Sequence, residues 1–129
     1  MTFQKQRITV LGSTGSIGIN TLDVIARHPE RFEVFALSAA TQVDSLLAQC
    51  VQFRPQYAVM VSQPQARLLA EKIKANGLFT QVLWAQDALE MIASHELVDC
   101  VMAAIVGAAG LLPCMAAASA GKQIGRAHV

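Results

Sequence analysis

The stretch that decides the fold is residues 8–18, which read Ile8-Thr9-Val10-Leu11-Gly12-Ser13-Thr14-Gly15-Ser16-Ile17-Gly18. Its first four residues are apolar or β-branched and predict a buried strand. The three glycines that follow predict a tight turn, and the apolar residues beyond them recur at helical spacing. A strand, a glycine turn and the start of a helix therefore lie together near the N-terminus.

The glycine spacing is G-x-x-G-x-x-G, one residue longer than the G-x-G-x-x-G fingerprint of dinucleotide-binding turns. Gly12 suits the sharp turn, Gly15 the close approach of a ligand to the backbone, and Gly18 the packing of the helix. A helix N-terminus offers unpaired N–H groups and a partial positive charge, so the pyrophosphate of a dinucleotide is the expected ligand. The alternative is an ordinary glycine-rich connection that binds nothing.

Length and composition limit the class of protein. The chain has 129 residues, enough for one domain with a hydrophobic core. It is 53% hydrophobic and 15% charged with a formal net charge of +1, and it has no basic run, so we expect no nucleic-acid partner. Aromatic residues are scarce and aliphatic residues abundant, which favours buried parallel strands. The first residues form no apolar segment, so we expect no signal peptide and a cytoplasmic protein.

The cysteines and the longest apolar stretch have simple interpretations. Cys50, Cys100 and Cys114 are widely spaced, and we expect reduced thiols rather than metal ligands. Residues 100–121 carry no charge, but glycines and a proline interrupt them, so we expect a strand, a turn and a helix and no membrane span. No paired carboxylates or histidines stand at a catalytic spacing, and we expect neither catalytic nor metal-binding residues in the chain.

Strand and helix patterns alternate along the whole chain. The expected strands are residues 7–11, 32–37, 57–61, 81–84 and 98–104, and the expected helices are residues 16–27, 42–53, 63–74, 86–95 and 108–120. Thr41 and Ser62 are the expected N-caps of the second and third helices. Five such units predict an α/β fold, a Rossmann-like doubly wound parallel sheet with helices on both faces. Its ligand is expected at the carboxyl ends of the first, second and fifth strands.

The end of the second strand bears on which dinucleotide is bound. NAD-binding domains usually place an acidic residue there for the ribose 2′-OH. Residues 37–42 contain no carboxylate, and the hydroxyls of Ser38 and Thr41 suit a 2′-phosphate, so NADP is favoured over NAD. The alternative is that this loop is only a connection. The small residues 103–110 would let a nicotinamide ring approach the backbone, or would serve only close packing of a strand on a helix.

Three motifs, residues 8–25, 53–59 and 101–113, together resemble the N-terminal part of the 1-deoxy-D-xylulose 5-phosphate reductoisomerase family. The resemblance implies an NADPH-dependent enzyme that converts 1-deoxy-D-xylulose 5-phosphate to 2-C-methyl-D-erythritol 4-phosphate in non-mevalonate isoprenoid biosynthesis. It also implies a sugar phosphate substrate, a homodimer, and a divalent metal (Mg or Mn) in a following catalytic domain. Its motifs assign cofactor contacts to Gly12, Thr14, Gly15, Ser16, Ile17, Gly18, Ala40, Thr41, Gln42, Ala104 and Ile105.

Two stretches depart from the family pattern. Residues 40–42 differ from the residues common in its 2′-phosphate loop, and residues 125–129 replace its Leu-Ala-Asn-Lys-Glu segment. We therefore expect residues 1–124 to be an NADPH-binding domain and residues 125–129 an atypical tail. The catalytic and C-terminal domains would be absent and the chain inactive alone. The alternatives are the NADP-binding domain of another dehydrogenase, such as a semialdehyde dehydrogenase, and a non-catalytic nucleotide-binding module.

Overall fold

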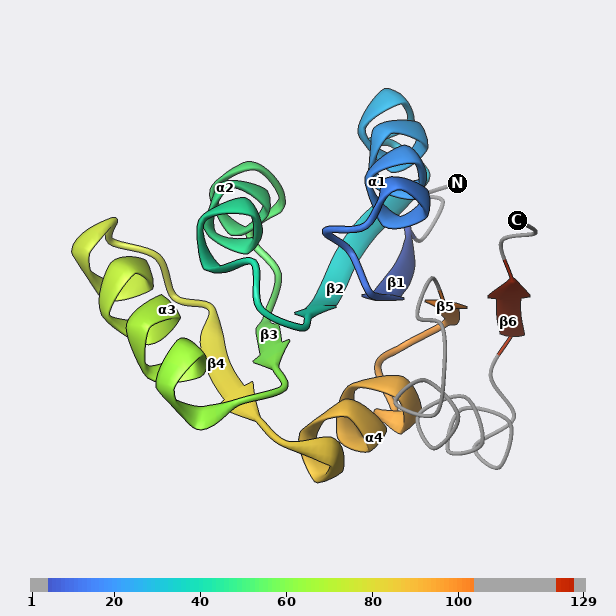
Figure 1. Cartoon of the computed structure of the whole chain (residues 1–129). Coiled ribbons are helices and arrows are strands. Elements are labelled where there is room, and N and C mark those ends of the chain that lie inside the picture. The colour runs from blue at the N-terminus through green and yellow to red at the C-terminus, as the bar shows by residue number, and fades with distance from the viewer. Residues whose placement is uncertain (1–4, 104–122, 127–129) are drawn as a thin grey trace.

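The structure is a computed structural model, and it describes residues 5–103 and 123–126 (Figure 1). Strands and helices alternate in these residues up to β5. In chain order, the elements are β1 (Gln6–Leu11), α1 (Ser16–Arg27), β2 (Phe32–Ala39), α2 (Val43–Phe53), β3 (Tyr57–Met60), α3 (Gln63–Ala75), β4 (Gln81–Trp84), α4 (Gln86–Ser94), β5 (Cys100–Ala103) and β6 (Gln123–Arg126).

The described strands form one sheet in the order β4-β3-β2-β1-β5-β6, and each neighbouring pair is parallel. The chain builds outward from β1 to β4 on one side and then returns to place β5 on the other side of β1. The topological switch point therefore lies between β1 and β5, where Leu11 pairs with Ala103. Ligands of open parallel sheets bind in the crevice at such a point.

Helices cover both faces of the sheet. One core packs α1, α2 and α3 against the strands, with Leu22, Leu46 and Leu69 among its buried side chains. The other packs α4 against the opposite face, where Leu89 and Ile92 are buried. Figure 1 shows this arrangement, with α4 across the sheet from α1 and α2. The expected Rossmann-like doubly wound sheet is confirmed.

The helix starts differ in detail from the expectation. Thr41 is not the N-cap of α2; Gln42 occupies that position, and neither it nor Thr41 caps the helix with a side chain. Ser62 is the N-cap of α3, but its hydroxyl donates to the side-chain oxygen of Gln65 instead of accepting from the backbone. The sequence pattern predicted the start of both helices to within one residue. It did not predict which hydrogen bonds the side chains at those starts make.

Strand β5 begins at Cys100, two residues later than expected, and the preceding Asp99 is bonded to the start of β1 through both its side chain and its backbone. The N–H of Arg7 donates to the Asp99 carboxylate, and the N–H of Asp99 donates to the Arg7 carbonyl, both at 2.9 Å. Strand β2 instead runs two residues longer than expected, to Ala39. This extension brings the end of β2 alongside the residues that follow β1.

Some expectations fall outside the described residues. They include the helix expected at residues 108–120, the cofactor contacts Ala104 and Ile105, and Cys114. Strand β6 pairs with β5 through Arg126, so it includes residues on both sides of the domain boundary expected at residue 124. Within the described part of the chain, no helix has both the length and the apolar character that crossing a bilayer requires.

Backbone strain is present at Ala85, between β4 and α4. This residue adopts φ 83° and ψ 171°, a region that is essentially restricted to glycine. Its N–H donates to the Met60 carbonyl at 3.2 Å, and its carbonyl accepts from the N–H of Leu89 at 3.4 Å. Contacts to both β3 and α4 therefore hold Ala85 in the strained conformation.

Replacing Ala85 with glycine should raise the free energy of unfolding by about 1 kcal/mol, because relief of the strain outweighs the added entropy of the unfolded chain. Urea denaturation measures this change. The matched control is Ala70→Gly at an exposed position inside α3, which should lower the same free energy by about 1 kcal/mol. Equal destabilisation by the two substitutions would contradict the strain assigned to Ala85.

Candidate functional site

The glycine turn lies at the switch point, between the end of β1 and the start of α1. Gly12 follows the buried Leu11 with φ 76°, a left-handed conformation that favours glycine. The N–H of Gly12 donates to Ser38 Oγ at 3.0 Å, and the N–H of Ser13 donates to the Ser38 carbonyl at 2.8 Å. The end of β2 therefore satisfies the first two amides of the turn and holds its entry in place.

The backbone amides that follow, in the turn and at the start of α1, differ from those of Gly12 and Ser13 in their hydrogen bonding. The N–H groups of Thr14, Ser16, Ile17 and Gly18 have no acceptor among the described residues. Gly15 is the N-cap of α1 and offers no side chain to cap them, and the first turn of α1 contains no acidic residue. Uncapped first-turn amides together with the positive end of the helix dipole favour an anionic ligand.

Gly15 and Gly18 serve different purposes. A Cβ on Gly18 would lie 2.3 Å from the Gly12 carbonyl oxygen and 2.6 Å from the Cα of Ser13, so α1 can pack on the turn only without a side chain there. A Cβ on Gly15 would meet the Gly12 oxygen at 3.7 Å, an ordinary contact, and Gly15 has φ −77°. The fold therefore requires glycine at position 18 and leaves open space at position 15.

The end of β2 lies beside the turn, because Val10 of β1 pairs with Leu37 of β2. The three residues after β2, Ala40, Thr41 and Gln42, are exposed at the same edge of the sheet. Asp44, in the first turn of α2, forms an ion pair with Lys72 of α3 at 2.9 Å. The loop itself contains no acidic residue that would repel a phosphate.

Ser38 does not have the role expected from the sequence. Its side chain is 2% exposed, and its hydroxyl oxygen accepts the Gly12 N–H, so it is not presented to a 2′-phosphate. This contradicts the expectation that the Ser38 hydroxyl accommodates that group. The physical reason is the extension of β2 to Ala39, which places Ser38 inside the sheet and against the turn.

Sequence reasoning also missed Ser13 and Gln49 as parts of the site. Ser13 is fully buried, and its hydroxyl donates to Gln49 Oε1 at 2.6 Å and lies 3.2 Å from the Ser38 carbonyl. Gln49 Nε2 donates in turn to the Ser13 carbonyl at 2.8 Å. The available signal was a glutamine on the buried side of α2, three residues after Leu46 and directly before Cys50.

The remaining reactive side chains of residues 5–103 point to no chemistry of their own. Burial raises the pKa of Cys50 to about 12, and burial followed by the charge of Asp99 raises the pKa of Cys100. Both thiols are free and poorly suited to act as nucleophiles. His95 packs its ring against Phe35 and Tyr57, with centroids 4.8 and 5.9 Å away. Among the described residues, no three His, Cys, Asp or Glu side chains converge to bind a metal ion.

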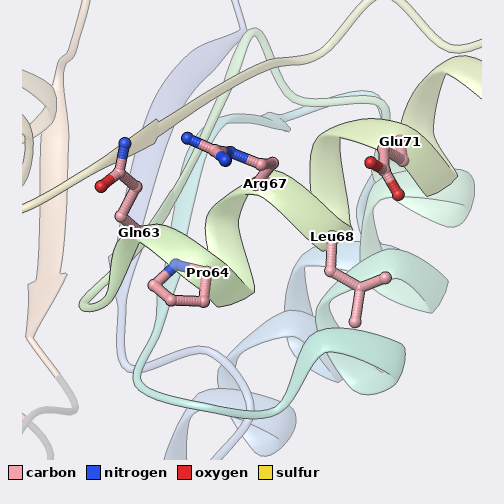
Figure 2. Close-up of a pocket in the computed structure, with 5 residues that line it drawn as sticks. All are labelled: Gln63, Pro64, Arg67, Leu68 and Glu71. Atoms are coloured by element: carbon pink, nitrogen blue, oxygen red, sulfur yellow. The ribbon is translucent and has the colours of Figure 1, made fainter.

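A surface depression on α3 is separate from the turn. Its volume is about 320 Å³, and it is lined by Gln63, Pro64, Arg67, Leu68 and Glu71 (Figure 2). All five residues belong to one helix, and the figure shows their side chains on its surface. No element of the glycine turn contributes to this depression, so it is not the candidate site.

The different surroundings of the two glycines lead to a prediction about stability. Gly18→Ala should lower the free energy of unfolding by about 3 kcal/mol, because the new methyl group overlaps backbone that cannot move independently of β1. Gly15→Ala, three residues away, should change it by less than about 1 kcal/mol, since the weaker N-cap is offset by the stiffer unfolded chain. Thermal and urea denaturation of both variants provide the measurement. Similar losses in both would show that packing requires both glycines.

The sequence and fold have clear relatives. The model of the 1-deoxy-D-xylulose 5-phosphate reductoisomerase family matches residues 8–128. The enzyme of that name from Laribacter hongkongensis is 58% identical over 119 residues, and the one from Nitrosospira multiformis is 55% identical over 119 residues. Each alignment covers 92% of this chain and 30% of the relative, so the chain spans about 30% of the length of these relatives.

Solved structures agree with the sequence comparison. A crystal structure of DOX-P reductoisomerase in complex with NADPH, fosmidomycin and magnesium matches with a TM-score of 0.89 and 44% identity, over 92% of this chain and 29% of that chain. The reductoisomerase from Zymomonas mobilis in complex with NADPH matches with a TM-score of 0.89 and 36% identity, over 97% of this chain and 32% of that chain. This chain therefore belongs to the 1-deoxy-D-xylulose 5-phosphate reductoisomerase family.

Proposed function

We propose that this chain is the NADPH-binding part of an enzyme that converts 1-deoxy-D-xylulose 5-phosphate to 2-C-methyl-D-erythritol 4-phosphate. The observation that carries the proposal is the row of N–H groups at Thr14, Ser16, Ile17 and Gly18, without acceptors in the described residues and placed at the switch point. Membership of the family supports it, since two structurally similar reductoisomerases are complexes with NADPH.

The proposed cofactor contacts follow the geometry of the turn. Gly12 shapes the turn, Thr14, Ser16 and Ile17 donate their N–H groups to the diphosphate, and the open space at Gly15 admits it. Gly18 brings the first turn of α1 close to the same point. When bound, NADPH supplies the hydride for the reduction, and the protein residues named here hold and orient it.

Two further groups of contacts lie at the same edge of the sheet. Ala40, Thr41 and Gln42 would surround the 2′-phosphate, where small and uncharged side chains leave room for it. Ala104 and Ile105 directly follow Ala103, the partner of Leu11 at the end of β5, and would face the nicotinamide side of the cofactor. Both assignments rest on the family motifs and on the position of the adjoining strand ends.

The divalent metal of the family does not fit this part of the chain. The described residues bring no set of three acidic, histidine or cysteine side chains together, and hard cations such as Mg²⁺ need convergent oxygen ligands. We therefore assign metal binding to parts of the protein other than residues 5–103, and, following the family resemblance, we assign the sugar phosphate contacts and the catalytic residues there as well. The 129-residue chain alone should bind cofactor without turnover.

Compartment and assembly belong to the same proposal. Cys50 and Cys100 are free thiols, as expected for a protein of the reducing cytoplasm. The resemblance to the family implies a homodimer of the complete protein with a small sugar phosphate as its substrate. The part of the chain described here, with its glycine turn at the switch point, would supply each subunit with its own cofactor site.

Substitution at Gly15 tests the diphosphate contact. Gly15→Val should abolish measurable NADPH binding, because a β-branched side chain fills the space through which the diphosphate reaches the backbone. Isothermal titration calorimetry of the wild-type chain and the variant measures the effect. Gly15→Ala controls for folding and should weaken binding while the melting temperature stays close to that of the wild type. Unchanged affinity in Gly15→Val would remove the turn from the cofactor site.

Substitution at Ala40 tests the preference for NADPH over NADH. Ala40→Asp places a carboxylate beside the proposed 2′-phosphate and should weaken NADPH binding by about tenfold, since like charges repel. NADH affinity should stay within about twofold of the wild-type value. The control is Ala40→Asn, which has nearly the same shape without the charge and should retain the preference for NADPH. Equal losses for both cofactors would place the 2′-phosphate elsewhere.

A further inference from the structure

The glycine turn is connected to α2 as well as to β2. Ser13, in the middle of the turn, is fully buried and meets the side chain of Gln49 from the second turn of α2. The Ser13 hydroxyl donates to Gln49 Oε1 at 2.6 Å, and Gln49 Nε2 donates to the Ser13 carbonyl at 2.8 Å. One amide group thus contacts the side chain and the backbone of the same residue.

The chemistry of the two groups sets the orientation of the Gln49 amide. A carbonyl oxygen only accepts hydrogen bonds, so Nε2 must face the Ser13 carbonyl and Oε1 must face the Ser13 hydroxyl. The hydroxyl has one proton, and the shorter of its two contacts directs that proton to Gln49 rather than to the Ser38 carbonyl at 3.2 Å. The pair is therefore complementary in one arrangement only.

The position of Gln49 on α2 explains how its contact with Ser13 can hold the turn in one conformation. Leu46 and Cys50 are fully buried and anchor α2 in the core, so Gln49 extends from a firmly packed helix. Among the hydrogen bonds of the described residues, those of Gln49 are the ones that join α2 to the turn. The Ser13 carbonyl belongs to the peptide whose N–H is that of Thr14. Fixing this carbonyl therefore fixes the direction of the first open donor.

We propose that Gln49 is a positioning residue for the cofactor: it holds the Ser13–Thr14 peptide so that the Thr14 N–H faces the diphosphate. This inference rests on the proposed binding of NADPH at the turn. Without the two hydrogen bonds from Gln49, the Ser13–Thr14 peptide would sample other orientations. Cofactor binding would then have to restore the orientation in which the Thr14 N–H faces the diphosphate, and the affinity would fall. Gln49 touches no part of the cofactor in this role and acts through Ser13.

The test compares Gln49→Met with Gln52→Met. Both changes remove a glutamine amide from α2, but Gln52 is exposed and makes no side-chain hydrogen bond within the described part of the chain. Calorimetry should show NADPH affinity about tenfold weaker in Gln49→Met, in line with the loss of hydrogen bonds to a buried group. Gln52→Met should match the wild type. If the contact between Gln49 and Ser13 served stability alone, Gln49→Met would lower the melting temperature and leave the NADPH affinity unchanged.

A second variant and a second measurement keep the inference falsifiable. Gln49→Glu keeps the side-chain length and the acceptor for the Ser13 hydroxyl, but it replaces the donor to the Ser13 carbonyl with a carboxylate oxygen. It should weaken NADPH binding at neutral pH, whereas Gln52→Glu should not. In the ligand-free chain, hydrogen exchange of the Gly12 and Ser13 amides, which bond to Ser38, should speed up in the Gln49 variants only.

The outcomes separate the inference from the proposed function. A wild-type chain that fails to bind NADPH contradicts the proposed function, and it removes the cofactor role of Gln49 whatever the exchange data show. If the wild type binds and both Gln49 variants bind as tightly as their Gln52 counterparts, the positioning role is wrong and the proposed function stands. Weaker binding together with faster exchange, confined to the Gln49 variants, supports the inference.

Discussion

The close packing of α1 on the glycine turn is the constraint on which the site depends. A Cβ at Gly18 would come within 2.3 Å of the Gly12 carbonyl oxygen, so helix and turn are in direct backbone contact. This contact places the first turn of α1 at the carboxyl end of β1, where the strand order reverses. A bulkier residue would push the helix away and move its open amides away from the carboxyl end of β1.

The turn divides its hydrogen-bonding groups between the fold and a ligand. The amides of Gly12 and Ser13 are satisfied by Ser38, and the carbonyl and hydroxyl of Ser13 are bonded to Gln49. The amides from Thr14 to Gly18, that of Gly15 excepted, find no acceptor among the described residues. Because unpaired amides at a helix N-terminus favour an anion, this division separates the part of the loop that the fold uses from the part left for the proposed diphosphate.

Gly15, the N-cap of α1, and Gly18, inside its first turn, illustrate how the structure refines a sequence motif. The sequence pattern predicts that Gly15 lets a ligand approach the backbone and that Gly18 lets the helix pack closely. In the structure, Gly18 has backbone within 3 Å of where a Cβ would lie, while the nearest atom at Gly15 lies at an ordinary 3.7 Å. Packing thus explains the glycine at position 18. At position 15, packing leaves the glycine unexplained, and the proposed approach of the cofactor diphosphate would account for it.

The sequence by itself determined the alternation of strands and helices, the fold class and the place of the glycine turn, because these depend on local periodicity and on the special conformations of glycine. It also carried the family motifs that the comparisons confirmed. Only the tertiary structure decided the partners of Ser38 and Gln49. The side chain of Ser38 turned inward because β2 extends to Ala39, and Gln49 meets Ser13 across 36 residues of chain. Such contacts arise from the packing of α2 and β2 beside β1, and no local pattern encodes them.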